Sequence, residues 1–108
     1  MSLLRYDSDS DSLYVNVSSK KAYLSMEISQ RIAVDLSESK KVVGVEILDA
    51  SKVLSGLFHK IVSKSKLKNL LCSVSEDDAI YLNFKLENKR ASLALPKAYK
   101  SPLLATSA

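Results

Sequence analysis

The feature that most constrains the fold is an alternation of apolar and polar residues that runs through most of the chain. In each run every second residue is apolar, so the apolar side chains share one face of an extended segment. Such a period of two is typical of a strand with one face buried and the other in water. The alternation predicts strands over residues 13–17, 22–28, 32–36, 43–47, 80–86 and 91–95, with weaker candidates in LLRYD and LLCSV.

The connections between these runs are short and polar, as in SSKK, SESKK and ENK. Connections of this length join neighbouring antiparallel strands, so we expect β-hairpins. A chain of 108 residues has the length of one domain, and we expect that domain to cover residues 1–99. Residues 100–108 have no clear period and contain Pro102, which predicts an extended or mobile tail.

One segment has a different period. Between Ser51 and Lys66 the apolar residues recur at helical spacing and form a single stripe. This spacing predicts one amphipathic helix over about residues 51–65, with Ser51 as its N-cap. We therefore predict an α+β domain, in which antiparallel β-hairpins are followed by one helix and then by a C-terminal β-hairpin.

The composition excludes several classes of protein. Cys72 is the only cysteine and His59 the only histidine, so an intrachain disulfide cannot form, and these two residues cannot by themselves supply the four ligands of a structural zinc site. No apolar run approaches the length of a membrane span, and residues 1–15 do not resemble a secretory signal. We therefore expect a soluble cytoplasmic protein without a bound cofactor.

The stretch YDSDSDSLYV carries three aspartates at alternate positions, Asp7, Asp9 and Asp11. Alternate carboxylates also begin a calcium-binding loop, but that loop needs Gly at its sixth position and Glu at its twelfth. Ser12 and Ser18 occupy those positions here. We therefore predict an acidic bend that starts a strand, and no metal site.

A second segment resembles this one. Residues 11–17 are similar to residues 78–84, and each follows an acidic bend that contains serine. We expect Asp11 and Asp78 to cap a turn through the nearby backbone. The similarity reflects either two hairpins that converged on one pattern or a partial duplication, and the sequence leaves both open.

Candidate catalytic groups are few. Glu27, Asp35 and Glu46 lie on the polar phase of their strands and could form paired carboxylates if those strands are neighbours. The more common arrangement is a solvated face with cross-strand pairs, here to Arg31 or Lys85. The chain also lacks a nucleophile elbow and a phosphate-binding loop. We therefore expect no enzyme activity and no catalytic residues.

Basic residues gather in the second half of the chain, although the net charge is only +4. The candidates for contact with phosphate groups are Lys52, Lys60, Lys64, Lys66 and Lys68. They fit a nucleic-acid-binding surface, but lysines are also common on the wet face of a helix, and no arginine lies nearby to bind guanine edges. Nucleic-acid binding is therefore the alternative function.

Three tyrosines are assigned to the polar phase of their strands: Tyr14, Tyr23 and Tyr81. Exposed tyrosines on a sheet are typical of a contact surface, because each offers a large ring and a hydroxyl group. Ordinary cross-strand packing is the alternative explanation. We treat these residues as a candidate partner surface.

Four short segments together resemble a known family. YD at 6–7, DSLYV at 11–15, VD at 34–35 and GVEILDAS at 44–51 are similar to a small prokaryotic family, the domain of unknown function numbered twenty-two eighty-three. The likeness covers about residues 3–54. The motif residues are Tyr6, Asp7, Asp11, Tyr14, Gly44, Glu46 and Asp49.

This resemblance implies a small β-rich intracellular protein of uncharacterised activity. Because some family members lie beside toxin genes, it also implies an antitoxin-like or regulatory role through a protein partner. Gly44 in mid-strand indicates a bulge or a close approach of the backbone. Glu46 is our first candidate for a functional side chain, since its place on a wet face has no structural explanation. The leading hypothesis is a protein-interaction module without catalytic activity.

The apolar faces also predict an oligomeric state. A helix of about 15 residues is about 22 Å long and about 10 Å wide, whereas eight strands in an open sheet span about 38 Å. One helix cannot cover so many apolar faces. The sheet must close into a barrel, split into two packed layers, or bury the remainder against another chain. We expect a homodimer, with closure within one chain as the alternative.

Overall fold

The structure is a computed structural model that describes residues 3–98. The elements follow in the order β1 (Leu4–Asp7), β2 (Ser12–Asn16), β3 (Leu24–Glu27), β4 (Ile32–Leu36), β5 (Val42–Ile47), α1 (Ala50–Phe58), α2 (Lys64–Leu67), β6 (Leu71–Glu76), β7 (Ile80–Leu86) and β8 (Lys89–Leu95). The predicted α+β class is confirmed, and both weaker strand candidates form strands, β1 and β6. The tail predicted at residues 100–108 lies outside the described residues.

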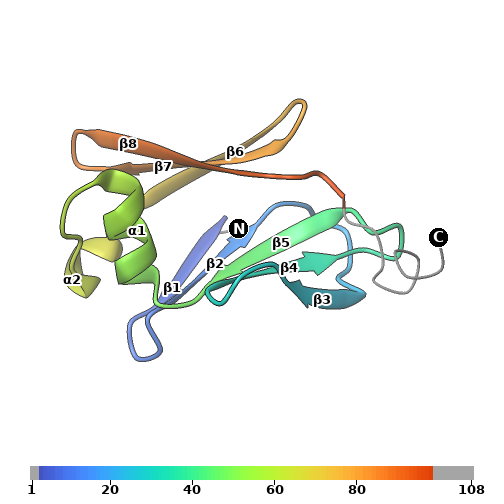
Figure 1. Ribbon diagram of the computed structural model, residues 1–108, viewed down its shortest axis with the longest axis horizontal. Coiled ribbons are helices and arrows are strands. Elements are labelled where there is room, and N and C mark those ends of the chain that lie inside the picture. Colours follow the sequence, from blue (N-terminus) through green and yellow to red (C-terminus); the bar gives the residue numbers. More distant parts are fainter. Residues whose placement is uncertain (1–2, 99–108) are drawn as a thin grey trace.

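β5 is the central strand of the larger sheet. This sheet has the order β1-β2-β5-β4-β3, and every neighbouring pair is antiparallel. The hairpins β1–β2 and β3–β4 therefore flank β5 on its two sides. The remaining strands form a three-stranded antiparallel sheet of order β6-β7-β8. Figure 1 shows the two sheets as separate layers, with α1 at one end.

The inner faces of the two sheets share one buried core. Leu13 on β2 and Val45 on β5 are completely buried in the same cluster as Leu82 on β7. Leu54 and Phe58 of α1 join this cluster at one end of the molecule. Burial of each large side chain of this kind contributes about 1.5–3 kcal/mol. Each layer thus covers the apolar face of the other within one chain.

This arrangement is one of the three solutions that the sequence left open. The argument for a homodimer assumed apolar faces that a single helix could not cover, and the second sheet covers them instead. The oligomeric state itself stays a prediction.

The main helix is shorter than predicted. α1 ends at Phe58, whereas we expected a helix over residues 51–65. His59 adopts a left-handed conformation with φ 56°, which ends the helix. The Ser55 hydroxyl stabilises the turn that follows, because it accepts the Val62 N–H at 2.8 Å. Helical periodicity of apolar residues therefore continued beyond the helix itself.

Two details of the helix prediction are also wrong. Ser51 is not the N-cap, because Asp49 occupies that position with φ 49° and α1 begins one residue later. Ile61, which was assigned to the apolar stripe, is 88% exposed. Neither helix within residues 3–98 is long and apolar enough to cross a membrane.

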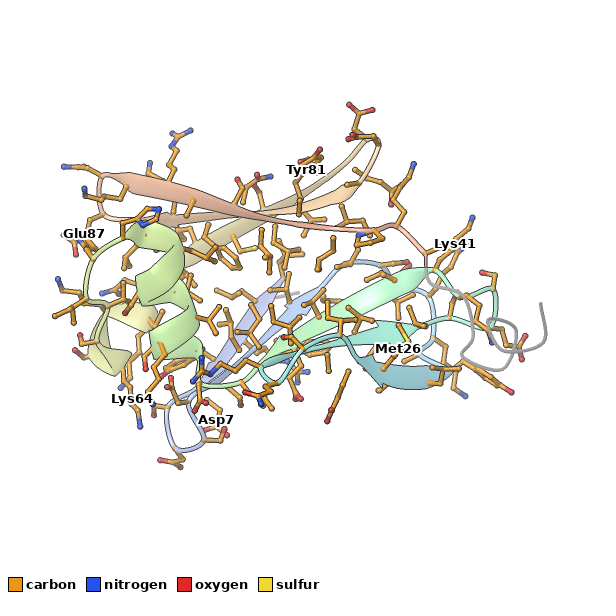
Figure 2. All side chains as sticks on the ribbon, in the orientation of Figure 1. Asp7, Met26, Lys41, Lys64, Tyr81 and Glu87 are labelled. Carbon is orange, nitrogen blue, oxygen red and sulfur yellow. The ribbon has the colours of Figure 1, made fainter. Side chains whose placement is uncertain are left out.

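Short contacts link the three-stranded sheet and the chain after it to the rest of the molecule at both ends. At the end away from α1, the Val42 N–H donates to the Lys97 carbonyl at 3.0 Å, and Lys41 forms an isolated bridge with Ala98. Near the helices, Lys66 Nζ lies 3.4 Å from Glu87 Oε1 in the β7–β8 turn. Figure 2 shows Lys41 and Glu87 at these opposite ends. The outer faces of both sheets remain open to solvent.

Candidate functional site

One buried carboxylate joins the β1–β2 hairpin to the start of α1. Asp11 ends the turn after β1 with φ 52°, and its side chain is buried. Its Oδ1 accepts the Tyr6 hydroxyl at 2.7 Å, and its Oδ2 accepts the Ser51 hydroxyl at 2.6 Å. Both oxygens also accept the Ser51 N–H, at 3.1 and 3.3 Å. We call Tyr6, Asp11 and Ser51 the Asp11 network.

The electrostatics of this network favour the charged form of the acid. Burial alone would raise the pKa of the Asp11 carboxyl, but the hydrogen bonds from Ser51 and Tyr6 and the positive charge of Lys64 hold that pKa below its ordinary value. Burial and the bond to Asp11 raise the pKa of Tyr6. The first turn of α1 has no acidic residue and the Asp49 N-cap makes no side-chain cap hydrogen bond, so Asp11 is the carboxylate that binds the N-terminus of this helix. The network is therefore structural.

The acidic bend predicted at residues 7–11 is present as a turn. The Asp9 N–H donates to Asp7 Oδ1 at 2.9 Å, as aspartate commonly does in turns. The Asp11 carboxylate was expected to cap its own turn, but it binds Ser51, which lies 40 positions later. Asp78 accepts the Tyr81 hydroxyl at 2.8 Å. Within residues 3–98 no group of three or more candidate metal ligands comes together.

A second set of contacts lies on the outer face of the five-stranded sheet. The Tyr14 side chain crosses Gly44 on β5, and its hydroxyl donates to Asp35 Oδ2 on β4 at 2.8 Å. A Cβ atom on Gly44 would overlap the Tyr14 hydroxyl and Cζ. Ser25 Oγ donates to the other Asp35 oxygen at 2.6 Å. The sequence predicted a bulge or a close approach at Gly44, and the structure has both. The β4–β5 register shifts beside this residue, and the absence of a side chain leaves space for the tyrosine.

Beside these contacts, three side chains lie next to one another across strands β1, β2 and β5. Arg5 is opposite Tyr14, and Tyr14 is opposite Glu46. The Arg5 guanidinium lies 5.3 Å from the centre of the Tyr14 ring, within the range of a cation–π contact. These residues line a depression of about 250 Å³. We call Arg5, Tyr14 and Glu46 the outer polar row.

Tyr14, in the middle of this row, and Glu46, at one end, differ in their partners. Burial, the bond to Asp35 and the nearby charges of Asp35 and Glu46 raise the pKa of Tyr14 to about 12, although Arg5 opposes them. Tyr14 is therefore a neutral hydrogen-bond donor at neutral pH. The Glu46 side chain is exposed, and its carboxylate makes no hydrogen bond or ion pair with any residue in the described part of the chain.

Comparison with known proteins gives a family match for the first half of the chain. Residues 4–51 match the family model described as a protein of unknown function, DUF2283. The resemblance predicted from the sequence is confirmed. Neither the curated proteins nor the solved structures give a match. The DUF2283 segment contains the five-stranded sheet, the outer polar row and the whole Asp11 network, whereas β6–β8 lie beyond it.

The remaining motif residue of the DUF2283 segment, Asp49, also has a structural role. Its backbone adopts the left-handed conformation that precedes α1, and its Oδ2 accepts Arg31 Nε at 3.2 Å. Arg31 was expected to pair with a carboxylate of the outer face instead, and so was Lys85. Lys85 in fact lies on the three-stranded sheet, opposite Leu71.

The sequence suggested that two of Glu27, Asp35 and Glu46 could form a carboxylate pair. All three do lie on the outer face of the DUF2283 segment, on neighbouring strands. Ala33 lies between Glu27 and Glu46 in the register of the sheet. Two strand spacings, about 10 Å, therefore separate the backbones of these two glutamates. Asp35 is held by Tyr14 and Ser25. The three strands that carry these carboxylates are therefore neighbours, as the prediction required. Asp35, however, accepts the Tyr14 hydroxyl and so positions that tyrosine.

The three tyrosines do not form one surface. Tyr14 lies on the outer face of the DUF2283 segment, and Tyr81 lies on the outer face of the other sheet, as Figure 2 shows. Tyr23 precedes β3, is 63% exposed and lies under the Lys40 ammonium. The tyrosines are thus three separate surface positions.

The predicted lysine cluster is divided as well, because α1 ends before most of it. Lys60 and Lys66 both lie within ion-pair distance of Glu87, at 4.0 and 3.4 Å. The charge of Lys64 acts on Asp11. Lys52 and Lys68 are exposed on α1 and after α2 respectively.

Sequence reasoning overlooked two residues of these sites. Arg5 belongs to the outer polar row, and the only signal was its place beside the motif pair at 6–7. Ser51 was assigned to capping its own helix, whereas it donates to Asp11. The available signal for that contact was that Asp11 and Ser51 both lie in segments that resemble the family.

Proposed function

We propose that this chain is a protein-interaction module and that the outer polar row of the DUF2283 segment contacts the partner. One observation carries the proposal. The other motif side chains have structural partners, whereas the Glu46 side chain is exposed and its carboxylate has no hydrogen bond or ion pair within residues 3–98. A motif carboxylate on a rigid central strand, without an internal role, is suited to binding another molecule.

The surroundings of Glu46 indicate the chemistry of that partner. Asp35 and Glu27 add negative charge on the same face, so a lysine or arginine of the partner fits beside Glu46. The Tyr14 ring offers apolar area, and Asp35 holds it in place. Arg5 can donate hydrogen bonds to a carboxylate or carbonyl of the partner at the edge of the sheet. The proposal includes no catalytic step, and the antitoxin-like role implied by the family would be one form of such binding.

The test is an affinity capture from a lysate of the source organism, quantified by mass spectrometry. Glu46→Lys reverses the central charge without entering the core. Lys85→Glu is the matched control, since it reverses one exposed charge on the opposite sheet. We expect at least one protein that the wild type and Lys85→Glu capture equally and that Glu46→Lys loses. If Glu46→Lys captures the same proteins in the same amounts, the outer polar row is not the contact.

Nucleic-acid binding has weaker support. Two of the candidate lysines, Lys60 and Lys66, already lie beside Glu87, and the cluster does not follow one helix face. A filter-binding titration with duplex and single-stranded DNA and RNA at two salt concentrations tests it directly. Salt-sensitive binding that is lost in Lys64→Glu and Lys68→Glu variants would replace our proposal with this one.

A further inference from the structure

We propose that β6 pairs with β6 of a second copy of this chain, so that two three-stranded sheets join into one antiparallel six-stranded sheet. This inference goes beyond the proposed function and does not depend on it. The outer polar row lies on the five-stranded sheet, whereas β6 is an edge of the other layer.

The first argument is the exposed edge. Within residues 3–98, β6 pairs with β7 alone and has six residues, whereas the edge strands β1 and β3 have four each. The fourth edge, β8, packs against α1, and the chain after it pairs with β5. Unpaired edges are commonly protected by charged side chains, and the only charge in β6 is Glu76 at its end. β6 is thus the edge best suited to receive another strand.

The second argument is the charge on either side of β6. The basic residues that precede the strand are Lys64, Lys68 and Lys66, of which Lys66 also lies beside Glu87 of its own chain, and the acidic residues at its end are Glu76, Asp77 and Asp78. In a two-fold antiparallel pair, the start of each β6 lies beside the end of the other. The basic segment of each copy therefore meets the acidic segment of its partner, twice per dimer. This complementarity selects a second copy as the occupant of the edge.

The third argument is the apolar side of the edge. Cys72 and Val74 face the core but are only partly buried, and they line a groove of about 880 Å³ together with Val17 and Val43. A second β6 would place its own inward-facing side chains beside them and narrow the mouth of this groove. On the outer side, Leu71 is 63% exposed and would gain a neighbouring strand.

The alternation of faces restricts the register of such a pair. Paired residues point to the same side, so inward-facing residues must lie opposite inward-facing residues. This condition requires one residue to lie on the two-fold axis. With Ser73 on the axis, Cys72 lies opposite the second copy's Val74, and Leu71 lies opposite the second copy's Ser75. This register pairs residues 71–75, which are five of the six residues of β6, and leaves Glu76 at the end of the pair.

A cysteine experiment tests both the partner and the register. In a Cys72→Ala background, Ser73→Cys places two thiols directly opposite each other, about 4.5–5.5 Å apart between Cα atoms, which allows a disulfide. Ser75→Cys is the matched control, because it is exposed on the same face but lies about 13 Å from its counterpart along the strand. We expect mild oxidation to link Ser73→Cys into dimers and to leave Ser75→Cys unlinked.

Light scattering coupled to gel filtration gives an independent readout. We expect the mass of two chains at micromolar concentration. Ser73→Lys, which places two ammonium groups opposite each other, should raise the dimer Kd about tenfold or more, while Ser75→Lys has a smaller effect. Circular dichroism of each variant confirms the fold, since both positions are exposed in the monomer. A mass of one chain up to about 100 µM, or a dimer that Ser73→Cys does not link, overturns the inference.

The two proposals fail separately. Glu46→Lys should leave the mass at two chains, because Glu46 lies on the other layer. A loss of the dimer in Glu46→Lys would contradict the assignment of the dimer contact to β6.

Discussion

Asparagine in place of Asp11 is the most informative single change in this protein. Asparagine keeps the size of the side chain and tolerates the φ of 52° at this position. It removes the negative charge and turns one of the two acceptor atoms into a donor. That donor would face the Ser51 N–H and hydroxyl, or else the Tyr6 hydroxyl. At least one hydrogen bond to a charged acceptor is therefore lost at a buried site.

The expected magnitude follows from this count. A hydrogen bond to a charged group contributes about 1.5–3 kcal/mol to stability, so we expect Asp11→Asn to lower the free energy of unfolding by about 2–3 kcal/mol at pH 7. The control is Asp9→Asn, which removes the same charge from the same turn. Asp9 is exposed and its carboxylate accepts no hydrogen bond within residues 3–98, so its replacement should cost less than about 0.5 kcal/mol.

The pH dependence of this difference provides a second test. The pKa of Asp11 is lower in the folded protein than its ordinary value, which in an unfolded chain is about 3.9. Its carboxylate therefore stabilises the fold fully above about pH 4, and this contribution is lost as the pH falls through the folded pKa. Urea denaturation at pH 7 and pH 3 measures it. We expect the gap between wild type and Asp11→Asn to narrow at pH 3; an equal gap at both pH values, or an Asp9→Asn cost as large as that of Asp11→Asn, would refute this reasoning.

Three further predictions concern single positions. Gly44→Ala should lower the free energy of unfolding by about 1–2 kcal/mol, because its Cβ displaces Tyr14 from its hydrogen bond, and should be neutral or stabilising in a Tyr14→Ala background; a cost that persists there in urea denaturation would contradict this explanation. Glu87→Gly should raise the free energy of unfolding by about 0.5–1 kcal/mol, and the melting temperature with it, because glycine adopts φ 56° without strain. Glu87→Ala should raise neither, and equal effects of the two variants would count against strain. Burial raises the pKa of Cys72 to about 11 from its usual 9.0, so its thiolate fraction at pH 7 should be about 100-fold lower. Slow labelling by a thiol reagent, which unfolding accelerates, is the expected result, and fast labelling of the folded protein would exclude it.

The strands were predictable because their signal is local. Alternation in a segment such as Ile80–Leu86 reports directly that one face is buried. The order of strands was not predictable, because the pairing of β2 with β5 joins residues as distant as Leu13 and Ile47. The SSKK connection predicted a hairpin between residues 13–17 and 22–28, which is wrong because β2 pairs with β5 and not with β3. The insertion of β5 between two hairpins leaves no mark in the sequence of either hairpin. The area argument showed that one helix cannot cover all the apolar faces, but it did not decide among the three solutions, of which the two packed layers are one.

The site was predictable to a lesser degree. The close approach at Gly44 could be inferred from a glycine in mid-strand, but the Tyr14 ring that causes it could not. The predicted length of α1 was wrong for a similar reason. The left-handed His59 and the hydroxyl of Ser55 end the helix, although the apolar periodicity continues beyond it. The contact between Asp11 and Ser51 depends on how a helix meets a hairpin, and no local pattern encodes that geometry.

The central position of β5 has a consequence for the time course of folding. During synthesis, the β1–β2 and β3–β4 hairpins are complete before Val42 is added to the chain. An isolated two-stranded hairpin is marginally stable in water, and these two hairpins share no edge until β5 lies between them. The larger sheet therefore cannot assemble stepwise from the N-terminus. It can form only when Val42–Ile47 becomes available to pair with both hairpins, so the nascent chain stays without the complete sheet until Ile47 has been added.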